Sequence, residues 1–274
     1  MRTTGSDLKV KANGIEICYD DLGAGSLPVI FIHGFPFNKS SWQPQLDTLQ
    51  QQFRVIAYDN RGFGQSEAGD ETLTITLMAN DLIRLMESLE IEKAVICGLS
   101  MGGYIALNAV TRFPDRFAAV VLCDTQCVGD TPEGAKKRYE TAENIQKGGK
   151  DKFAEGFITK LFARETMASN AALQHTVKEM ITATSAPTLV AALGALAQRT
   201  ETCTELKNVT TPSLIICGEE DSITPPAQSE SMHTNLSSSE YVTIPAAGHL
   251  SNLEQPALFN EILQNYLIRM TATS

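Results

Sequence analysis

Four short runs of residues are apolar on both faces, and amphipathic stretches separate them along the chain. These runs are rich in valine and isoleucine, and they occupy residues 28–34, 54–59, 94–100 and 118–124. A strand with no polar face is buried between two layers, as parallel strands covered by helices are. The alternation of such strands with longer helical stretches predicts an α/β fold: a mostly parallel sheet with helices on both faces.

Local signals place further elements around these runs. Asn13-Gly14 separates two strand-like segments, and this dipeptide is a strong signal for a β-hairpin. Residues 74–89 carry leucine and methionine roughly on one stripe, as an amphipathic helix does. The stretch 101–112 is also expected to be helical, and it stops before Pro114 because the residue preceding a proline avoids the helical conformation.

The pattern changes after Asp124. Residues 130–203 contain almost no β-rich run and are expected to form about four helices, whereas strand-like runs resume at 212–218 and 240–245. We therefore predict an α/β core of residues 1–129 plus 204–274, with a helical insertion over 130–203. A second independent domain is the alternative, but the core would be incomplete without the segment after residue 205.

Charge and apolar content exclude several classes of function. The formal net charge of -10 repels phosphate backbones and anionic lipid, so we expect no nucleic-acid or membrane partner. No stretch approaches the roughly 18 consecutive apolar residues of a membrane-spanning helix, and the N-terminal residues lack the apolar core of a secretory signal. A cytoplasmic protein fits these features.

The six cysteines are scattered. Four of them lie in strand-like apolar runs, which favours buried reduced thiols over disulfides. Cys123-x-x-x-Cys127 has no second pair of ligands downstream, so a zinc site is not expected.

The segment Gly98-Leu99-Ser100-Met101-Gly102 matches the pattern G-x-S-x-G and lies between a buried strand and a helix. A sharp strand-to-helix turn lifts a serine hydroxyl above the sheet, and it needs small residues two positions before and after the serine. The context therefore predicts that Ser100 is a nucleophile.

A serine nucleophile needs a base, and the base needs a carboxylate that orients it. His249 follows the last strand-like run in a loop of small residues, and Asp221 follows the preceding run. Both loops belong to the carboxyl edge of a parallel sheet, which also carries Ser100. We predict His249 as the base and Asp221 as the acid.

Other residues compete for these roles. Among the histidines, His175 and His233 occur in helical stretches without glycine loops, so surface or packing roles are expected for them. Among the acids, Glu219 and Glu220 are close in sequence to Asp221, and Asp124 also follows a strand at the same edge.

Hydrolysis of an acyl bond passes through an oxyanion that needs two preorganised donors. The backbone N–H of Met101 and the backbone N–H of Phe35, in the loop after residues 28–34, are the candidates. His33 in the same loop is expected to fix the loop by hydrogen bonds.

With these residues assembled, the chain resembles the α/β-hydrolase family over nearly its whole length, and within it the small carboxylesterases and the 3-oxoadipate enol-lactonase-like group. The resemblance implies an eight-stranded sheet and makes the insertion at 130–203 a helical cap over an acyl pocket. The motifs that carry it are HGFP (33–36), DNRGFGQS (59–66), GLSMGG (98–103), LCDT (122–125), GEEDSITPP (218–226) and AAGHLSNLEQP (246–256).

We expect an esterase that acts on small to medium esters or lactones, with no cofactor and no metal. Ser100 excludes the relatives whose nucleophile is an aspartate. Leu99 replaces the asparagine that often precedes the serine in carbon–carbon bond hydrolases, which disfavours that alternative; perhydrolases and non-catalytic small-molecule receptors are the others. The apolar cap residues either line the pocket or pack on the core: Phe153, Phe157, Leu161, Phe162, Leu189, Leu193 and Leu196.

Overall fold

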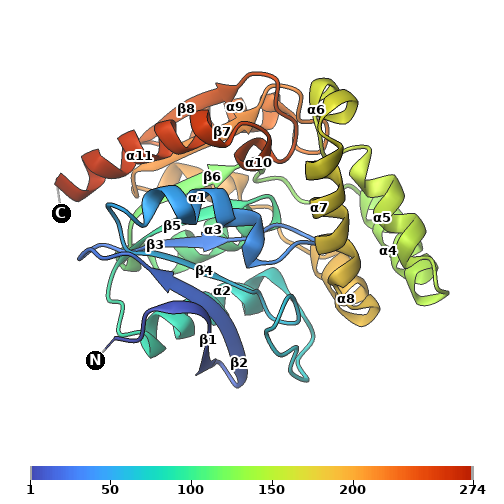
Figure 1. The fold of residues 1–274 in the computed structure, drawn as a ribbon, viewed down its shortest axis with the longest axis horizontal. Coiled ribbons are helices and arrows are strands. Elements are labelled where there is room, and N and C mark those ends of the chain that lie inside the picture. Colours follow the sequence, from blue (N-terminus) through green and yellow to red (C-terminus); the bar gives the residue numbers. More distant parts are fainter. Residues whose placement is uncertain (1, 273–274) are drawn as a thin grey trace.

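The computed structural model describes residues 2–272 and contains one eight-stranded sheet in the order β1-β2-β4-β3-β5-β6-β7-β8 (Figure 1). Strands β1 and β2 are antiparallel to each other, β2 is antiparallel to β4, and all other neighbours are parallel. The predicted α/β class is therefore confirmed. The strands are β1 (Gly5–Ala12), β2 (Ile15–Leu22), β3 (Val29–Ile32), β4 (Val55–Tyr58), β5 (Ala94–Leu99), β6 (Phe117–Cys123), β7 (Ser213–Gly218) and β8 (Ser239–Ile244).

The predicted hairpin joins β1 to β2. Ala12 pairs with Ile15 across a two-residue turn. Asn13 and Gly14 have φ angles of 49° and 80°. Positive φ at both central residues is what a type I′ turn requires, and asparagine followed by glycine meets this requirement at little cost.

Helices cover both faces of the sheet. Alternate residues of each central strand enter two separate apolar clusters: in β3, Ile30 and Ile32 face one layer, whereas Val29 and Phe31 face the other. The first layer contains α2 (Ile75–Ser88), α3 (Met101–Arg112) and α9 (Pro226–Asn235), and the second contains α1 (Gln43–Leu49) and α11 (Pro256–Ala272). Each fully buried aliphatic side chain of these clusters stabilises the fold by about 1.5–3 kcal/mol. Short helices complete the chain: η1 (Lys39–Trp42), η2 (Pro114–Arg116), η3 (Cys203–Asn208) and α10 (Ser251–Glu254).

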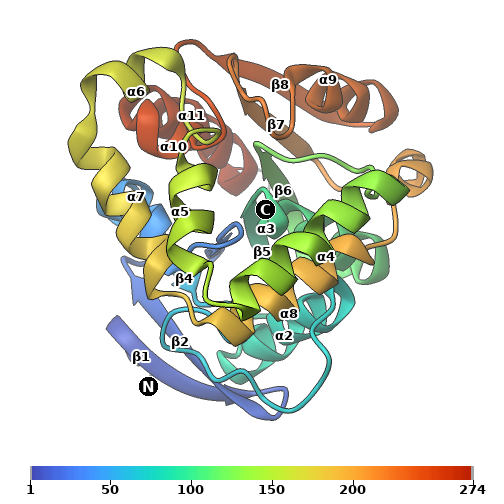
Figure 2. The same cartoon turned by 90° about the vertical axis from the view of Figure 1, so that its right-hand side faces the viewer.

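Between β6 and β7, the chain forms a helical segment that lies at one end of the sheet (Figures 1 and 2). Five helices form where about four were expected, because Asn170 separates α6 (Arg164–Ser169) from α7 (Ala171–Ala183). The Asn170 side chain caps α7 by accepting a hydrogen bond from Leu173 N. In residues 2–272, no single helix is long and apolar enough to span a membrane. Of the helices in this range, only α7 and α8 (Ala186–Ala197) together reach that length and apolar content, and the two helices are bent by 93° relative to each other. The helices are α4 (Pro132–Gln146), α5 (Lys150–Ile158), α6 (Arg164–Ser169), α7 (Ala171–Ala183) and α8 (Ala186–Ala197).

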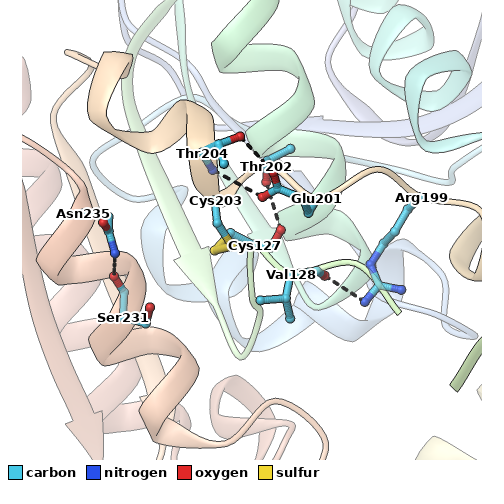
Figure 3. Close-up of a disulfide and its surroundings, with 9 residues drawn as sticks. All are labelled: Cys127, Val128, Arg199, Glu201, Thr202, Cys203, Thr204, Ser231 and Asn235. Carbon is cyan, nitrogen blue, oxygen red and sulfur yellow. Dashed lines mark hydrogen bonds between the residues drawn. A yellow bond between two sulfur atoms is a disulfide. The ribbon is translucent and has the colours of Figure 1, made fainter. Parts of the chain in front are cut away.

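The cysteines correct one prediction. Cys127, four residues after β6 ends, and Cys203, the first residue of η3, form a disulfide (Figure 3). They are 76 residues apart and lie at the two ends of the helical segment, so only the tertiary fold brings them together. The preference for reduced thiols is wrong for this pair, and these two residues no longer support a cytoplasmic location. The four remaining cysteines are free and buried, as expected: Cys18, Cys97, Cys123 and Cys217.

Candidate active site

Ser100 occupies the turn between β5 and α3. Its φ of 53° and ψ of -111° lie outside the regions that residues with a side chain normally adopt, so the backbone is strained there. Two hydrogen bonds hold this conformation: Ser100 N donates to Cys123 O at the end of β6 at 2.9 Å, and the Thr125 side-chain hydroxyl donates to Ser100 O at 2.8 Å. The predicted strand–serine–helix turn is therefore present.

The flanking glycines are required by close backbone approach. A Cβ atom on Gly98 would lie 2.3 Å from Gly102 O, and one on Gly102 would lie 2.1 Å from Ile32 O. No side chain tolerates such contacts with backbone atoms, so both positions need glycine for this turn to form.

The structure brings together the three residues predicted for the triad. His249 Nε2 lies 2.8 Å from Ser100 Oγ, and His249 Nδ1 lies 2.8 Å from Asp221 Oδ2. An ionised carboxylate only accepts hydrogen bonds, so Nδ1 carries the proton and donates it to Asp221. Nε2 of the neutral imidazole is then free to accept the hydrogen bond from the serine hydroxyl.

Asp221 is held by the residues that follow it. Ile223 N and Thr224 N donate to Asp221 Oδ1 at 2.8 and 3.0 Å, and Thr224 Oγ1 donates to Oδ2 at 2.7 Å. This is an Asx-type turn, in which an aspartate accepts from the backbone two and three residues later. Sequence reasoning missed Thr224; the spacing Asp-x-x-Thr ahead of a proline is the signal that could have found it.

The buried surroundings shift the pKa values of Asp221 and His249 in opposite directions. Burial lowers the pKa of the His249 imidazole, but the Asp221 carboxylate and its hydrogen bond outweigh burial and raise that pKa above the ordinary value. Burial alone would raise the pKa of the Asp221 carboxyl. The charge of His249 and the hydrogen bonds to the carboxylate outweigh burial, so the pKa of Asp221 lies below its ordinary value. Asp221 is therefore ionised at neutral pH, and it stabilises an imidazolium at His249.

Asp124, the rival acid, is directed to other partners. Gly218 N donates to its Oδ1 at 2.8 Å, and Ser251 N and Oγ donate to its Oδ2 at 3.2 and 2.6 Å. Burial raises the pKa of Asp124 to about 7. Asp221, and not Asp124, makes the hydrogen bond to His249. Of the other rivals, Glu220 bonds Arg164 instead.

His33 fixes the loop after β3, as expected. Asn60 N donates to His33 Nε2 at 3.0 Å, so the proton is on Nδ1, which donates to Gly34 O at 2.9 Å. Burial lowers the pKa of His33 to about 4, so the ring is neutral at pH 7.

The loop after β3 abuts the serine. A Cβ atom on Gly34 would lie 3.2 Å from Ser100 Cβ, so the loop that continues into Phe35 passes close to Ser100. Met101 is the first residue of α3, where backbone N–H groups have no partner within the helix. Within residues 2–272, neither the Phe35 amide nor the Met101 amide donates a hydrogen bond. The two predicted oxyanion donors are therefore adjacent to Ser100 and unengaged.

The helical segment contacts the His249 loop through backbone groups, which sequence reasoning did not anticipate. His249 N donates to Leu161 O at 2.7 Å. The Glu254 carboxylate accepts from Gly248 N at 2.7 Å and from Ala163 N at 2.8 Å. The turn after α5 and the loop that carries His249 are thus held in one arrangement.

A pocket of about 1040 Å³ lies between α4 and α5 and extends to Phe35. The apolar side chains singled out in the helical segment fall into two groups. Phe153, Phe157 and Leu193 line the pocket, and Leu193 is also buried in one of the apolar clusters. The others are buried in the apolar clusters: Leu161, Phe162, Leu189 and Leu196.

A group of possible metal ligands lies beneath the triad, where donor atoms of Asp124, Cys217 and Asp221 are within 4.8 Å of one another. Both carboxylates already accept hydrogen bonds from their neighbours. Burial raises the pKa of the Cys217 thiol well above its ordinary value, so the sulfur stays protonated. A protonated thiol between engaged carboxylates is a poor donor set for a metal ion.

Comparisons with known proteins agree with this architecture. 3-Oxoadipate enol-lactonase 1 of Acinetobacter baylyi is 29% identical over 263 residues, covering 96% of this chain and 94% of that protein. A putative non-heme bromoperoxidase of Mycobacterium tuberculosis is 30% identical over 265 residues, covering 94% and 100%. The solved structure of a thermophilic esterase from Thermogutta terrifontis superposes with a TM-score of 0.92 at 33% identity, covering 96% and 98%.

These relatives support the predicted hydrolase enzyme and its resemblance to esterases and enol-lactonases. The sequence profile of the alpha/beta hydrolase fold matches residues 28–256, which include Ser100, Asp221 and His249. The chain belongs to the alpha/beta hydrolase fold family.

Proposed function

We propose that this protein is a serine hydrolase of small to medium carboxylic esters or lactones, working through an acyl-enzyme. The observation that carries the proposal is the continuous hydrogen-bonded chain from Ser100 through His249 to Asp221, with 2.8 Å at each step. A nucleophile, a base in contact with it and a carboxylate that orients the base are the three parts that acyl transfer needs.

In the proposed mechanism, Ser100 Oγ attacks the ester carbonyl while His249 Nε2 takes the hydroxyl proton. The Asp221 carboxylate stabilises the resulting imidazolium, consistent with the raised pKa of His249. The amides of Phe35 and Met101 hold the oxyanion. Nε2 then gives its proton to the leaving alcohol, which leaves an ester between Ser100 and the acyl group.

Deacylation repeats these steps with water. His249 takes a proton from the attacking water, a second oxyanion forms in the same amide pair, and its collapse releases the acid and restores the Ser100 hydroxyl. For a lactone the alcohol and the acid are the same molecule, so the product leaves only after this second step. The mechanism uses no cofactor and no metal.

The proposal assigns residues 130–203 as a cap that roofs the acyl pocket, above a core of residues 1–129 and 204–274. It is supported by the pocket lining, to which the segment contributes Phe153, Phe157 and Leu193. A cap binds the part of the substrate that is remote from the reacting carbonyl, so it selects among acyl groups.

The test of the nucleophile is the variant Ser100→Ala. We expect a loss of p-nitrophenyl acetate hydrolysis on the order of 10⁴-fold or more, together with loss of covalent labelling by a fluorophosphonate. Ser238→Ala, which changes an exposed serine, is the matched control and should keep both properties. Undiminished labelling of a folded Ser100→Ala protein would refute the assignment, and wild-type protein that binds the ester without turnover would indicate a receptor.

Perhydrolysis is a second candidate, favoured by the haloperoxidase name of one relative. Here hydrogen peroxide replaces water in attacking the acyl-enzyme, and the product is a peracid that can oxidise a halide. Peracid formation from acetate and hydrogen peroxide, measured by halogenation of a dye, tests this candidate. Since the same acyl-enzyme is involved, Ser100→Ala should abolish both reactions.

A further inference from the structure

Asp124 is a buried acid for which the proposed mechanism has no role. It follows the last residue of β6, and it is completely buried. Its φ of 44° lies in the left-handed region, where a residue with a side chain is strained. Strain of this kind persists only where the surrounding structure holds it, and it is concentrated at functional sites. A carboxylate oxygen of this strained residue lies within 4.8 Å of an Asp221 oxygen.

The Asp124 carboxylate anchors the two loops that carry the acid and the base. Its Oδ1 accepts at 2.8 Å from the N–H of Gly218, the last residue of β7, after which the Asp221 loop begins. Its Oδ2 accepts from the N–H and the hydroxyl of Ser251, the first residue of α10, where the His249 loop ends. One side chain at the end of β6 therefore holds both loops at once.

The same two loops contact each other next to these anchor points. A Cβ atom on Gly218 would lie 2.0 Å from Gly248 O, so the backbones are in direct contact. In addition, Glu220 N donates to Ala247 O at 2.8 Å. Because the loops are this closely packed, a shift of either one changes the distance between the base and the acid.

The charge of Asp124 also acts on the base. Burial lowers the pKa of His249, the Asp221 carboxylate outweighs burial, and the Asp124 carboxylate raises the pKa of His249 further. Burial, followed by the charge of Asp221, raises the pKa of Asp124 itself to about 7. Asp124 is therefore ionised at alkaline pH, where the imidazole is the free base. Two carboxylates then act on one imidazole.

The other titratable groups near this buried cluster leave the charge of Asp124 distinct. On β6 and β7, burial raises the pKa of the Cys123 and Cys217 thiols, so both stay uncharged. On α10, the Glu254 carboxylate also raises the pKa of His249, but less than Asp124 does.

We propose that Asp124 is a positioning residue for the proposed hydrolysis. Its carboxylate keeps the Asp221 loop and the His249 loop in register. Its negative charge adds to that of Asp221 in stabilising the imidazolium that forms when Ser100 attacks the ester. This role rests on the proposed esterase function, because Asp124 acts through the base and the acid and exchanges no proton with the substrate.

The first variant is Asp124→Asn, which keeps the size of the side chain and removes its charge. We expect kcat for p-nitrophenyl acetate to fall by about 10- to 100-fold, because displacing a catalytic group by about 1 Å lowers the rate by about 10²-fold. KM should change by less than about twofold, since Asp124, Gly218 and Ser251 do not line the pocket between α4 and α5.

The pH dependence separates this role from a purely structural one. Without the charge of Asp124 the pKa of His249 falls, so the acidic midpoint of kcat/KM should move to lower pH by about half a unit or more, even as the maximal rate drops. NMR titration of the imidazole measures the same pKa without turnover, and the variant His249→Gln assigns the signal.

Two further variants isolate the hydrogen bonds and the charge. Ser251→Ala keeps the carboxylate and removes one of its hydrogen bonds, so kcat should fall by about two- to tenfold and the midpoint should move less than in Asp124→Asn. Asp115→Asn is the matched control, because it removes an exposed carboxylate just before β6, at the opposite end of the strand from Asp124. It should keep both the wild-type kcat and the wild-type midpoint.

The role of Asp124 and the esterase function fail in different ways. A Ser251→Ala protein with the wild-type kcat, or an Asp124→Asn midpoint that is not below that of Ser251→Ala, overturns the role of Asp124 and leaves the esterase function standing. Wild-type protein that neither hydrolyses p-nitrophenyl acetate nor is labelled by a fluorophosphonate overturns the esterase function, and the role of Asp124 with it.

Discussion

Removing the disulfide should cost stability without disturbing the active site. The change is the double variant Cys127→Ser/Cys203→Ser, which leaves no unpaired thiol at the site. The closed loop spans 76 residues. For a loop of that length, the chain-entropy relation gives a loss of about 15 cal/mol/K, or about 4.5 kcal/mol at 25 °C. Since domains are stable by only about 5–15 kcal/mol, this is a large fraction of the total.

The native contacts around the bridge explain why the site should be spared. Thr202 N donates to Cys127 O at 2.8 Å, and the Arg199 guanidinium donates to Val128 O at 3.0 Å (Figure 3). These hydrogen bonds hold the two ends of the helical segment together once the protein has folded. The disulfide therefore acts mainly on the unfolded chain, and kcat/KM for a p-nitrophenyl ester at 25 °C should not change.

Urea unfolding followed by fluorescence measures the free energy of unfolding. Trp42 is the single tryptophan and is fully buried between Phe31 and Phe259, so its emission reports on the core. We expect a lower midpoint for the variant, and a larger dependence of the free energy on urea because its unfolded state is less compact.

A reductant supplies the internal control. It should destabilise the wild-type protein and leave the double variant unaffected, because the remaining cysteines are already thiols. Thiol titration of the unfolded protein should rise from four groups to six when wild type is reduced. The reasoning would be refuted if the free energy of unfolding of the double variant were within about 1 kcal/mol of the wild-type value, or if unreduced wild type showed six reactive thiols.

Three further predictions concern the site. Asp221→Asn should lower kcat by about 10⁴-fold because it favours the wrong imidazole tautomer, whereas Asp124→Asn should lower kcat far less. Steady-state kinetics at neutral pH measure both losses, and a larger loss for Asp124→Asn would assign the acid to Asp124, after β6. His249 must be neutral to act as the base, and its pKa is raised above 6.5. We therefore expect kcat/KM to be maximal at alkaline pH and to fall on acidification with a midpoint above pH 6.5. A pH–rate profile with a midpoint below 6.5 contradicts this. Phe157→Ala should change the ratio of kcat/KM for acetate to kcat/KM for octanoate esters by about tenfold or more. Phe162→Ala should mainly lower the free energy of unfolding, by about 3–5 kcal/mol. An equal loss of kcat/KM on both esters in a stable Phe157→Ala variant would exclude that ring from the pocket.

Sequence reasoning succeeded where the physical requirement is local. Positive φ at Asn13 and Gly14, and the close approach at Gly98 and Gly102, leave few alternatives to the residues present. The order of the strand-like runs also predicted that Ser100 lies at the same sheet edge as the loops that carry Asp221 and His249, because the carboxyl ends of parallel strands lie at one edge.

It failed where a partner comes from a distant segment. Nothing near Cys127 in the sequence points to Cys203, which lies 76 residues away. Sequence reasoning also could not separate pocket-lining from core residues. Phe157 and Phe162 were both candidates for the pocket, yet Phe157 lines it and Phe162 is buried in the core. Periodicity identifies which residues are apolar but cannot say which of them face a cavity.

The hydrogen bond from His249 N to Leu161 O limits how this protein can be recombined. Grafting a lid from another hydrolase treats the lid as a module that meets its scaffold only at two junctions. Here a third connection exists. The backbone N–H of His249 donates to Leu161 O, and the nearby Glu254 carboxylate accepts from Ala163 N. A chimaera joined at residues 129/130 and 203/204 replaces those backbone groups, so it must reproduce the turn at 161–163 to keep the imidazole in place. New substrate ranges are therefore more accessible through changes on α4 and α5 than through exchange of the whole segment.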